Sequence, residues 1–157
     1  MKKLIFPFLI LGFLLTSCEN DDDVCVSGEA TPRLKIKFKS ADNKGLTLDS
    51  LYLDVDYGNN NILTVVKAAK VDSALIPIRV DDAGFTELYV RKTKKGSVSK
   101  IKLNYNTTSE YVSPACGFKR LYQNLSGTLE TANPVTKVEL NQNQIINENK
   151  AHLYLVF

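Results

Sequence analysis

The sequence contains no tryptophan, one methionine, one histidine and three cysteines in 157 residues. The methionine is Met1, so binding surfaces rich in methionine or tryptophan are poorly supplied. With His152 as the sole histidine and no Cys-x-x-Cys pair, the ligand spacings of zinc sites are missing. We therefore expect no metal and no cofactor, and we expect that the protein is not an enzyme.

The chain also lacks a large excess of charge. It has 20 basic and 17 acidic side chains, and two of the basic ones are Lys2 and Lys3 at the start. Without that start the chain is nearly neutral. Proteins that bind nucleic acids present a basic face, so we expect no nucleic-acid partner.

Lys2 and Lys3 precede an apolar run from Leu4 to Leu15. This run is shorter than the roughly 20 residues that span a bilayer, and it is typical of a secretory signal peptide. The sequence Leu-Thr-Ser-Cys that ends at Cys18 resembles the lipobox of bacterial lipoproteins. We expect residues 1–17 to be cleaved and Cys18 to carry the lipid, including palmitate, that anchors the chain in the outer membrane.

Glu19, Asp21, Asp22 and Asp23 follow the lipidated cysteine. This cluster resembles the surface-export signal of Bacteroidota lipoproteins, and it would place the domain on the cell surface. The alternative is a solvated tether without a signal, over residues 18–30.

Apolar and polar residues alternate in the clearest segments. In 33–39, Leu34, Ile36 and Phe38 fall on one face and basic residues fall on the other. The same pattern appears in 51–57. A period of two with one apolar face predicts half-buried strands.

No stretch has the apolar spacing of an amphipathic helix over three turns. Further strands are predicted at 62–66, 75–80, 111–112, 135–140 and 152–157, with a hairpin over 85–105 and loops at 67–70 and 123–133. Such a series predicts an all-β domain over 31–157, an antiparallel two-sheet sandwich of immunoglobulin-like type. A small β-barrel is the alternative.

A few polar side chains could take part in catalysis. Asp54 and Asp56 share one strand face and could serve acid–base chemistry on sugars, but we favour cross-strand pairing with Lys35 and Lys37. His152 could act as a base toward a cysteine nucleophile. We expect it instead to be a surface or interfacial residue.

Two surface features complete the set of candidates. Ser50 and Ser73 each follow an aspartate and precede an aliphatic residue, which resembles the O-glycosylation motif of exported Bacteroidota proteins. Basic residues could face anionic lipid headgroups, although a solvated face that protects sheet edges is the favoured interpretation. They are Lys35, Lys37, Lys39, Arg91, Lys92, Lys94, Lys95, Lys100 and Lys102.

The most distinctive segment is "EYVSPACGFKRLYQNL", residues 110–125. It is similar to the Tyr-Val-Ser-x-Ala-Cys-Gly-Phe-Lys signature of a family of short flavobacterial lipoproteins whose domain has no known function. The lipobox, the early cysteine and the closing "NENKAHLYLVF" fit the same family. The resemblance implies export to the cell envelope and an outer-membrane β-barrel as a partner, and it supplies no catalytic residue.

If lipid occupies Cys18, then Cys25 and Cys116 remain. Two cysteines in an exported domain are expected to pair, and this bridge would pin the tether to the body of the domain. Gly117 would allow a positive φ beside it. Two buried thiols, or a bond from Cys25 to another chain, are the alternatives.

Together these features predict a lipid-anchored envelope protein that serves as an interaction or accessory subunit at the outer membrane. A surface module that binds a glycan or a peptide is the alternative function. A flat apolar patch would favour the first and a concave pocket with convergent polar groups the second.

Overall fold

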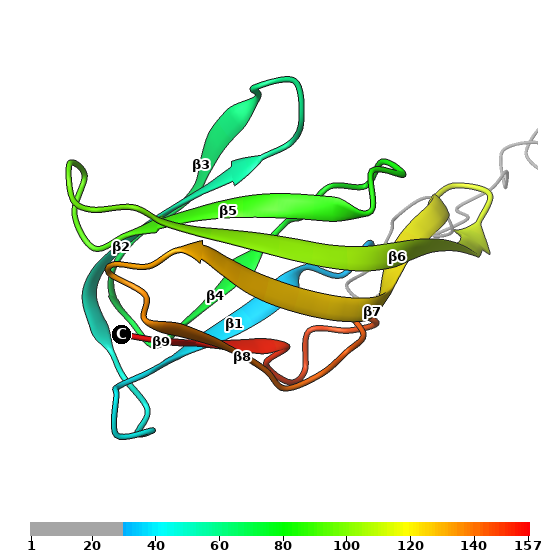
Figure 1. The fold of residues 1–157 in the computed structure, drawn as a ribbon. Coiled ribbons are helices and arrows are strands. Elements are labelled where there is room, and N and C mark those ends of the chain that lie inside the picture. Colours follow the sequence, from blue (N-terminus) through cyan, green and yellow to red (C-terminus); the bar gives the residue numbers. More distant parts are fainter. Residues whose placement is uncertain (1–29) are drawn as a thin grey trace, which may run out of the picture.

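The computed structural model describes residues 30–157, which form nine strands in two sheets packed face to face (Figure 1). The predicted two-sheet sandwich is confirmed, and the sheets do not close into a barrel. The described residues include no helix able to cross a membrane. The strands are β1 (Leu34–Lys39), β2 (Leu48–Asp56), β3 (Ile62–Val71), β4 (Ser73–Ile76), β5 (Phe85–Arg91), β6 (Ser99–Ser113), β7 (Gly117–Thr131), β8 (Lys137–Leu140) and β9 (Leu153–Val156).

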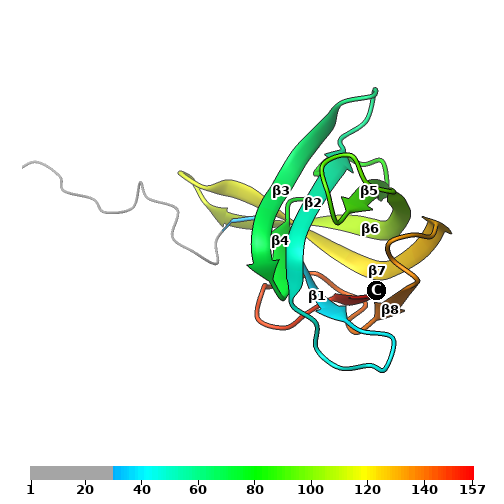
Figure 2. The same cartoon turned by 90° about the vertical axis from the view of Figure 1, so that its left-hand side faces the viewer.

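One sheet has the order β4-β1-β9-β8 and the other β3-β2-β5-β6-β7 (Figure 2). Neighbouring strands are antiparallel as predicted, except that β1 and β9 are parallel, with Ile36 opposite Leu153. The first and last strands therefore lie together in the middle of the smaller sheet. The segment that precedes β1 and the loop that precedes β9 meet at one end of that sheet.

The core lies between the sheets and follows the predicted alternation. Leu34, Ile36 and Phe38 of β1 point inward, and so do Leu51 and Leu53 of β2. Apolar side chains at every second position place one face of each strand in the core, because successive side chains in a strand point to opposite faces. Burial of these side chains supplies most of the favourable free energy of folding.

The predictions for the least patterned segments are wrong. The predicted loop at 67–70 belongs to β3, and 123–131 belongs to β7. Tyr111 and Val112 do not open a new strand but lie near the end of the fifteen-residue β6. In all three places few side chains are buried, so no apolar alternation marks the strand.

Candidate functional site

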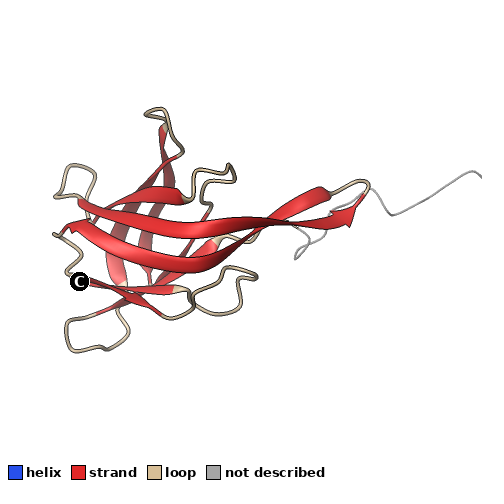
Figure 3. Ribbon diagram, turned by 45° about the vertical axis from the view of Figure 1, so that its right-hand side comes forward, coloured by secondary structure: helices blue, strands red, loops and turns tan. Residues whose placement is uncertain are grey.

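The distal arm, which we define as residues 106–121, is the outer half of the β6–β7 hairpin and projects beyond the sandwich (Figure 3). None of its residues is buried. In the inner half, by contrast, Ile101, Leu103 and Tyr105 alternate into the core. A two-stranded ribbon without a hydrophobic face is only marginally stable, so the arm depends on contacts along its own length.

An aromatic pair marks the tip of the arm. Tyr111 lies opposite Phe118, their ring centroids are 5.4 Å apart, and the planes meet at 68°. The two residues are 56% and 69% exposed. In the turn beside them the Cys116 N–H donates to Ser113 Oγ over 3.1 Å, and Gly117 has the expected positive φ of 66°. Exposed aromatic side chains at a projecting tip indicate a contact surface.

Polar contacts hold the arm in place along its length. Lys119 pairs with Glu110 across the strands at 2.9 Å. Arg120 donates to Ser109 Oγ at 2.8 Å, and its backbone N–H donates to Thr31 Oγ1 at 2.9 Å. Thr31 is near the start of the described residues. The described residues that precede β1 therefore contact the arm.

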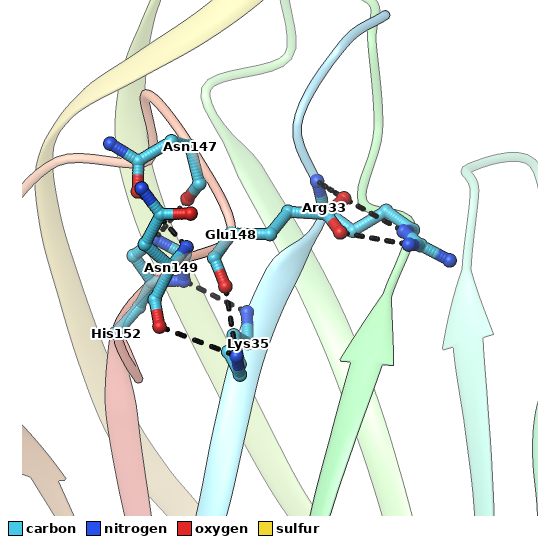
Figure 4. Close-up of polar contacts among 6 residues, drawn as sticks. All are labelled: Arg33, Lys35, Asn147, Glu148, Asn149 and His152. Carbon is cyan, nitrogen blue, oxygen red and sulfur yellow. Dashed lines mark hydrogen bonds and ion pairs between the residues drawn. The ribbon is translucent and has the colours of Figure 1, made fainter. Parts of the chain in front are cut away.

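Two residues further on, the same segment reaches a polar cluster that we call the tether corner (Figure 4). Arg33 and Glu148 form its main ion pair: both Arg33 Nε and one terminal guanidinium nitrogen donate to the carboxylate at 2.8 Å. The Arg33 backbone N–H also donates to Glu148 at 2.9 Å. These donors, above all the side chain of Arg33, lower the pKa of Glu148. The corner consists of Arg33, Lys35, Asn147, Glu148, Asn149 and His152.

His152 is fully buried in this corner, so the expectation of a surface or interfacial histidine is wrong. Its Nδ1 accepts the Lys35 backbone N–H at 2.8 Å, and its Nε2 donates to the Asn147 carbonyl at 3.0 Å. Burial lowers the pKa of His152, so the ring is held neutral. Its role is to join the start of β1 to the loop that precedes β9, because both ring nitrogens bond to backbone groups.

A hollow of about 580 Å³ lies beside the tether corner. Its walls are residues 30–33 on one side and 146–149 on the other. The polar groups of Arg33 and Glu148 that line it already bond to each other. What remains for a ligand is mainly asparagine amides and backbone groups.

The two edges of the five-stranded sheet differ. Beyond β7, Tyr122 and Ile145 exchange backbone hydrogen bonds of 3.2 and 2.8 Å, and the Leu125 N–H donates to the Asn143 carbonyl. Among residues 30–157, β3 pairs only with β2. Ile62 and Leu63, at the projecting start of β3, are 48% and 51% exposed. One edge of the sheet is therefore covered and the other is open (Figure 2).

The predicted modification sites lie on strands. Ser50 is the third residue of β2 and its hydroxyl donates to the Lys92 carbonyl, whereas Ser73 begins β4 and its hydroxyl donates to Asp72 at 2.8 Å. Their O-glycosylation stays a prediction. Cys18 and Cys25 lie outside the described residues, so lipidation and the bridge to Cys116 also stay predictions.

The expected carboxylate pairing is wrong. Asp54 pairs with Arg91 of the neighbouring β5 and accepts a hydrogen bond from Thr64 at 2.6 Å. It cannot reach Lys35 or Lys37, because β1 belongs to the other sheet. Alternation shows which residues share a face of one strand, but it does not show which strands are neighbours.

The predicted basic set does not form one cationic face. Its β1 members point outward from one sheet, while those of β5 and β6 belong to the other sheet. Several are neutralised locally: Lys39 pairs with Glu139 at 2.8 Å, and Lys100 contacts both Glu87 and Glu130. A broad electrostatic contact with anionic lipid is therefore not favoured by the fold.

Comparison with known families identifies the domain. Residues 45–157 match the profile of DUF6452, a family of unknown function. The chain belongs to this family. The matched range contains the distal arm and the 110–125 signature, and it begins after the lipobox. Searches of curated proteins and of solved structures give no match. Membership in DUF6452 therefore supplies no activity.

Proposed function

We propose that this DUF6452 protein is a lipid-anchored, non-enzymatic accessory subunit of the outer membrane, attached through Cys18 and oriented toward the cell surface. Its sandwich binds another envelope protein through the open edge of β3. The observation that supports this proposal is the contrast between the two edges of the five-stranded sheet: β7 is covered by residues 143–145, and β3 has no such cover in the described chain.

An open edge strand presents unpaired backbone N–H and C=O groups, and a strand from another chain can pair with them. The ten-residue β3 is long enough to hold such a strand. Ile62 and Leu63 add exposed apolar surface at its start, and Lys67 and Lys70 introduce charges further along that disfavour non-specific pairing. These features fit selective binding of one partner strand.

The partner that we propose is an outer-membrane β-barrel protein with an extended strand or loop outside its barrel. Main-chain hydrogen bonds would supply affinity, and the side chains of Ile62 and Leu63 would supply specificity. The lipid anchor would keep the two proteins in the same membrane and raise the effective concentration of one near the other.

Anchoring is tested separately from binding. In cells given a clickable palmitate analogue, the wild-type chain should become labelled and fractionate with the outer membrane. The Cys18→Ser variant should lose both properties. A matched Cys116→Ser variant should keep both, and wild-type protein without label would overturn the anchoring proposal.

The edge contact is tested with a photo-crosslinking amino acid at position 63 in native membranes, with position 146 as the control. Ile146 is 52% exposed and lies in a loop of the other edge region. A crosslink to a β-barrel protein at 63, absent at 146 and lost in a Thr64→Pro variant that is still folded, supports the proposal. Equal crosslinking at both positions would contradict it.

A glycan- or peptide-binding module is the second candidate, and the hollow beside the tether corner favours it. Its asparagine amides could bond to sugar hydroxyls or to a peptide backbone. Titration with outer-membrane oligosaccharides, followed by NMR shifts of residues 146–149, tests this function. Shifts that vanish in an Asn147→Ala variant would favour it over the edge contact.

A further inference from the structure

We propose that the tip of the distal arm rests in the headgroup region of the membrane, with Tyr111 and Phe118 as the inserted side chains. This inference rests on the proposed anchoring through Cys18 but not on the β3 contact. It assigns a lipid contact to a surface that folding leaves exposed.

The first argument is the chemistry of the tip. Tyr111 and Phe118 are the exposed aromatic pair at the end of the arm, beside the turn. Aromatic rings are enriched at membrane–water interfaces, where one part of the ring meets hydrocarbon and the other meets water.

The second argument is the position of the anchor relative to the tip. Thr31 bonds to Arg120, which lies two residues from Phe118 along β7, a distance of about 7 Å. Cys18 and Thr31 are thirteen positions apart, and the chain between them reaches at most about 45 Å when fully extended. The described chain therefore ends beside the arm, and this tether is long enough for the arm tip to reach the membrane.

The opposite end of the domain, by contrast, lies far from the arm tip. Val98 precedes β6 and is 38% exposed, but it lies about 40 Å from Tyr111 along the strand. Because Thr31 lies beside the arm, a domain that stands upright on the membrane with the arm downward holds the tip at the membrane and Val98 far from it. A bridge from Cys25 to Cys116 would shorten the free tether to the seven positions from Cys18 to Cys25, about 25 Å, and would favour this orientation.

The charges of the distal arm do not oppose its contact with the membrane. In the distal arm, Glu110 is the acidic residue that faces Lys119, and Arg120 adds a second positive charge. Arg120 also pairs with the exposed Asp82 at 3.2 Å. Because these groups already pair among themselves, the aromatic rings and not the charges provide the proposed attraction.

The absence of tryptophan makes a direct test simple, because one introduced tryptophan is the sole indole fluorophore of the chain. Phe118→Trp and Tyr111→Trp probe the tip, and Val98→Trp is the matched control at the far end of β6. Each lipidated full-length variant is reconstituted in phosphatidylethanolamine–phosphatidylglycerol vesicles, with or without lipids brominated in the upper acyl chain. Circular dichroism confirms the β fold of each variant.

The tip variants should shift their emission to the blue in vesicles and be quenched by the brominated lipid, whereas V98W should show neither change. Unchanged emission from both tip variants, in protein whose Cys18 lipid is confirmed by mass spectrometry, would overturn the inference and leave the anchoring proposal intact. Equal quenching of V98W and F118W would overturn it as well. A mass that shows no lipid on Cys18 would instead overturn the anchoring proposal, and this inference with it.

Discussion

The inner and outer halves of the β6–β7 hairpin consist of the same two strands, but their surroundings differ. In the inner half, side chains of both strands enter the core. They are Ile101, Leu103 and Tyr105 of β6 and Tyr122 and Leu125 of β7. In the distal arm no side chain is buried. Backbone pairing therefore extends the ladder beyond the sandwich without a buried face, and the contact with Thr31 and the ion pair of Lys119 with Glu110 help to hold the arm in place.

Because of this difference, the residues that stabilise the fold are not the residues that are available for contact with a partner. Burial in the inner half contributes to the free energy of folding, whereas the exposed rings of the arm contribute little to it. A surface that the fold does not need can evolve toward binding. The same separation applies to the open edge of β3, where Ile62 and Leu63 are exposed.

The largest expected effect comes from the inner half. Leu103 is fully buried against the other sheet, and the Leu103→Ala variant should lose about 2–5 kcal/mol of unfolding free energy because it leaves a cavity. Urea denaturation followed by circular dichroism measures the loss. A loss below about 0.5 kcal/mol, the range of ordinary surface substitutions, would show that this strand is not part of the core.

A disulfide would give the arm a larger share of the stability than its burial predicts. We expect Cys25 and Cys116 to form one linked peptide in non-reducing mapping of the mature protein, and their reduction to cost about 2–4 kcal/mol. The loop that they close contains about 90 residues, which favours a large effect in the chain-entropy description. Two separately alkylated thiols would refute the pairing.

Two tyrosines at the boundary between the halves sharpen the comparison. Tyr105 and Thr86 share a hydrogen bond of 2.6 Å, so Tyr105→Phe should cost about 1 kcal/mol. The Tyr122 hydroxyl is buried and has no hydrogen-bond partner among residues 30–157, and burial raises its pKa. Tyr122→Phe should therefore be neutral or stabilising, since it removes an unpaired polar group. Urea denaturation measures the unfolding free energy of both variants, and equal losses would contradict the predicted difference between the two hydroxyls.

The tether corner should respond to acid more than either half of the hairpin. The folded state lowers the pKa of His152 through burial, so the unfolded chain takes up a proton first as the pH falls. Its contribution to stability is complete above the ordinary histidine pKa of about 6.5 and declines below it. Glu148 adds a further loss below its ordinary pKa of about 4.3, because its pKa is lowered too.

Thermal unfolding between pH 7.5 and 5 measures this response. The wild-type midpoint should fall as the pH drops through the range below 6.5. In a His152→Asn variant, whose amide can accept the Lys35 N–H without titrating, the midpoint should be lower at neutral pH but flatter with pH. Parallel slopes in the two proteins would exclude His152 as the source.

The smallest effect is expected at the tip. Phe118→Ala should change the unfolding free energy by no more than about 0.5 kcal/mol, because the side chain is 69% exposed. The same urea titration that measures Leu103→Ala provides the comparison. A loss of 2 kcal/mol or more would mean that the arm packs against a part of the protein outside residues 30–157.

The sequence predicted the sandwich because its core strands bury one face each, and Leu34, Ile36 and Phe38 show that face by alternation alone. It did not predict the distal arm, because strands with two solvent-exposed faces have no apolar period to detect. The aromatic signature around Tyr111 and Phe118 was the signal that could have found it. The sequence did not predict the burial of His152. Its partners, Lys35 in β1 and Asn147 in the loop before β9, come together only through the parallel pairing of β1 with β9.

Hydrogen exchange along β6 tests the difference between the two halves most directly. In the unlipidated domain at neutral pH, backbone amides of 100–105 should exchange only through global unfolding, whereas those of 106–113 should exchange at least about a hundredfold faster through opening of the arm. Mass spectrometry of overlapping peptides resolves the two segments. Equal protection along the whole strand would contradict the claim that the arm lies outside the cooperative core.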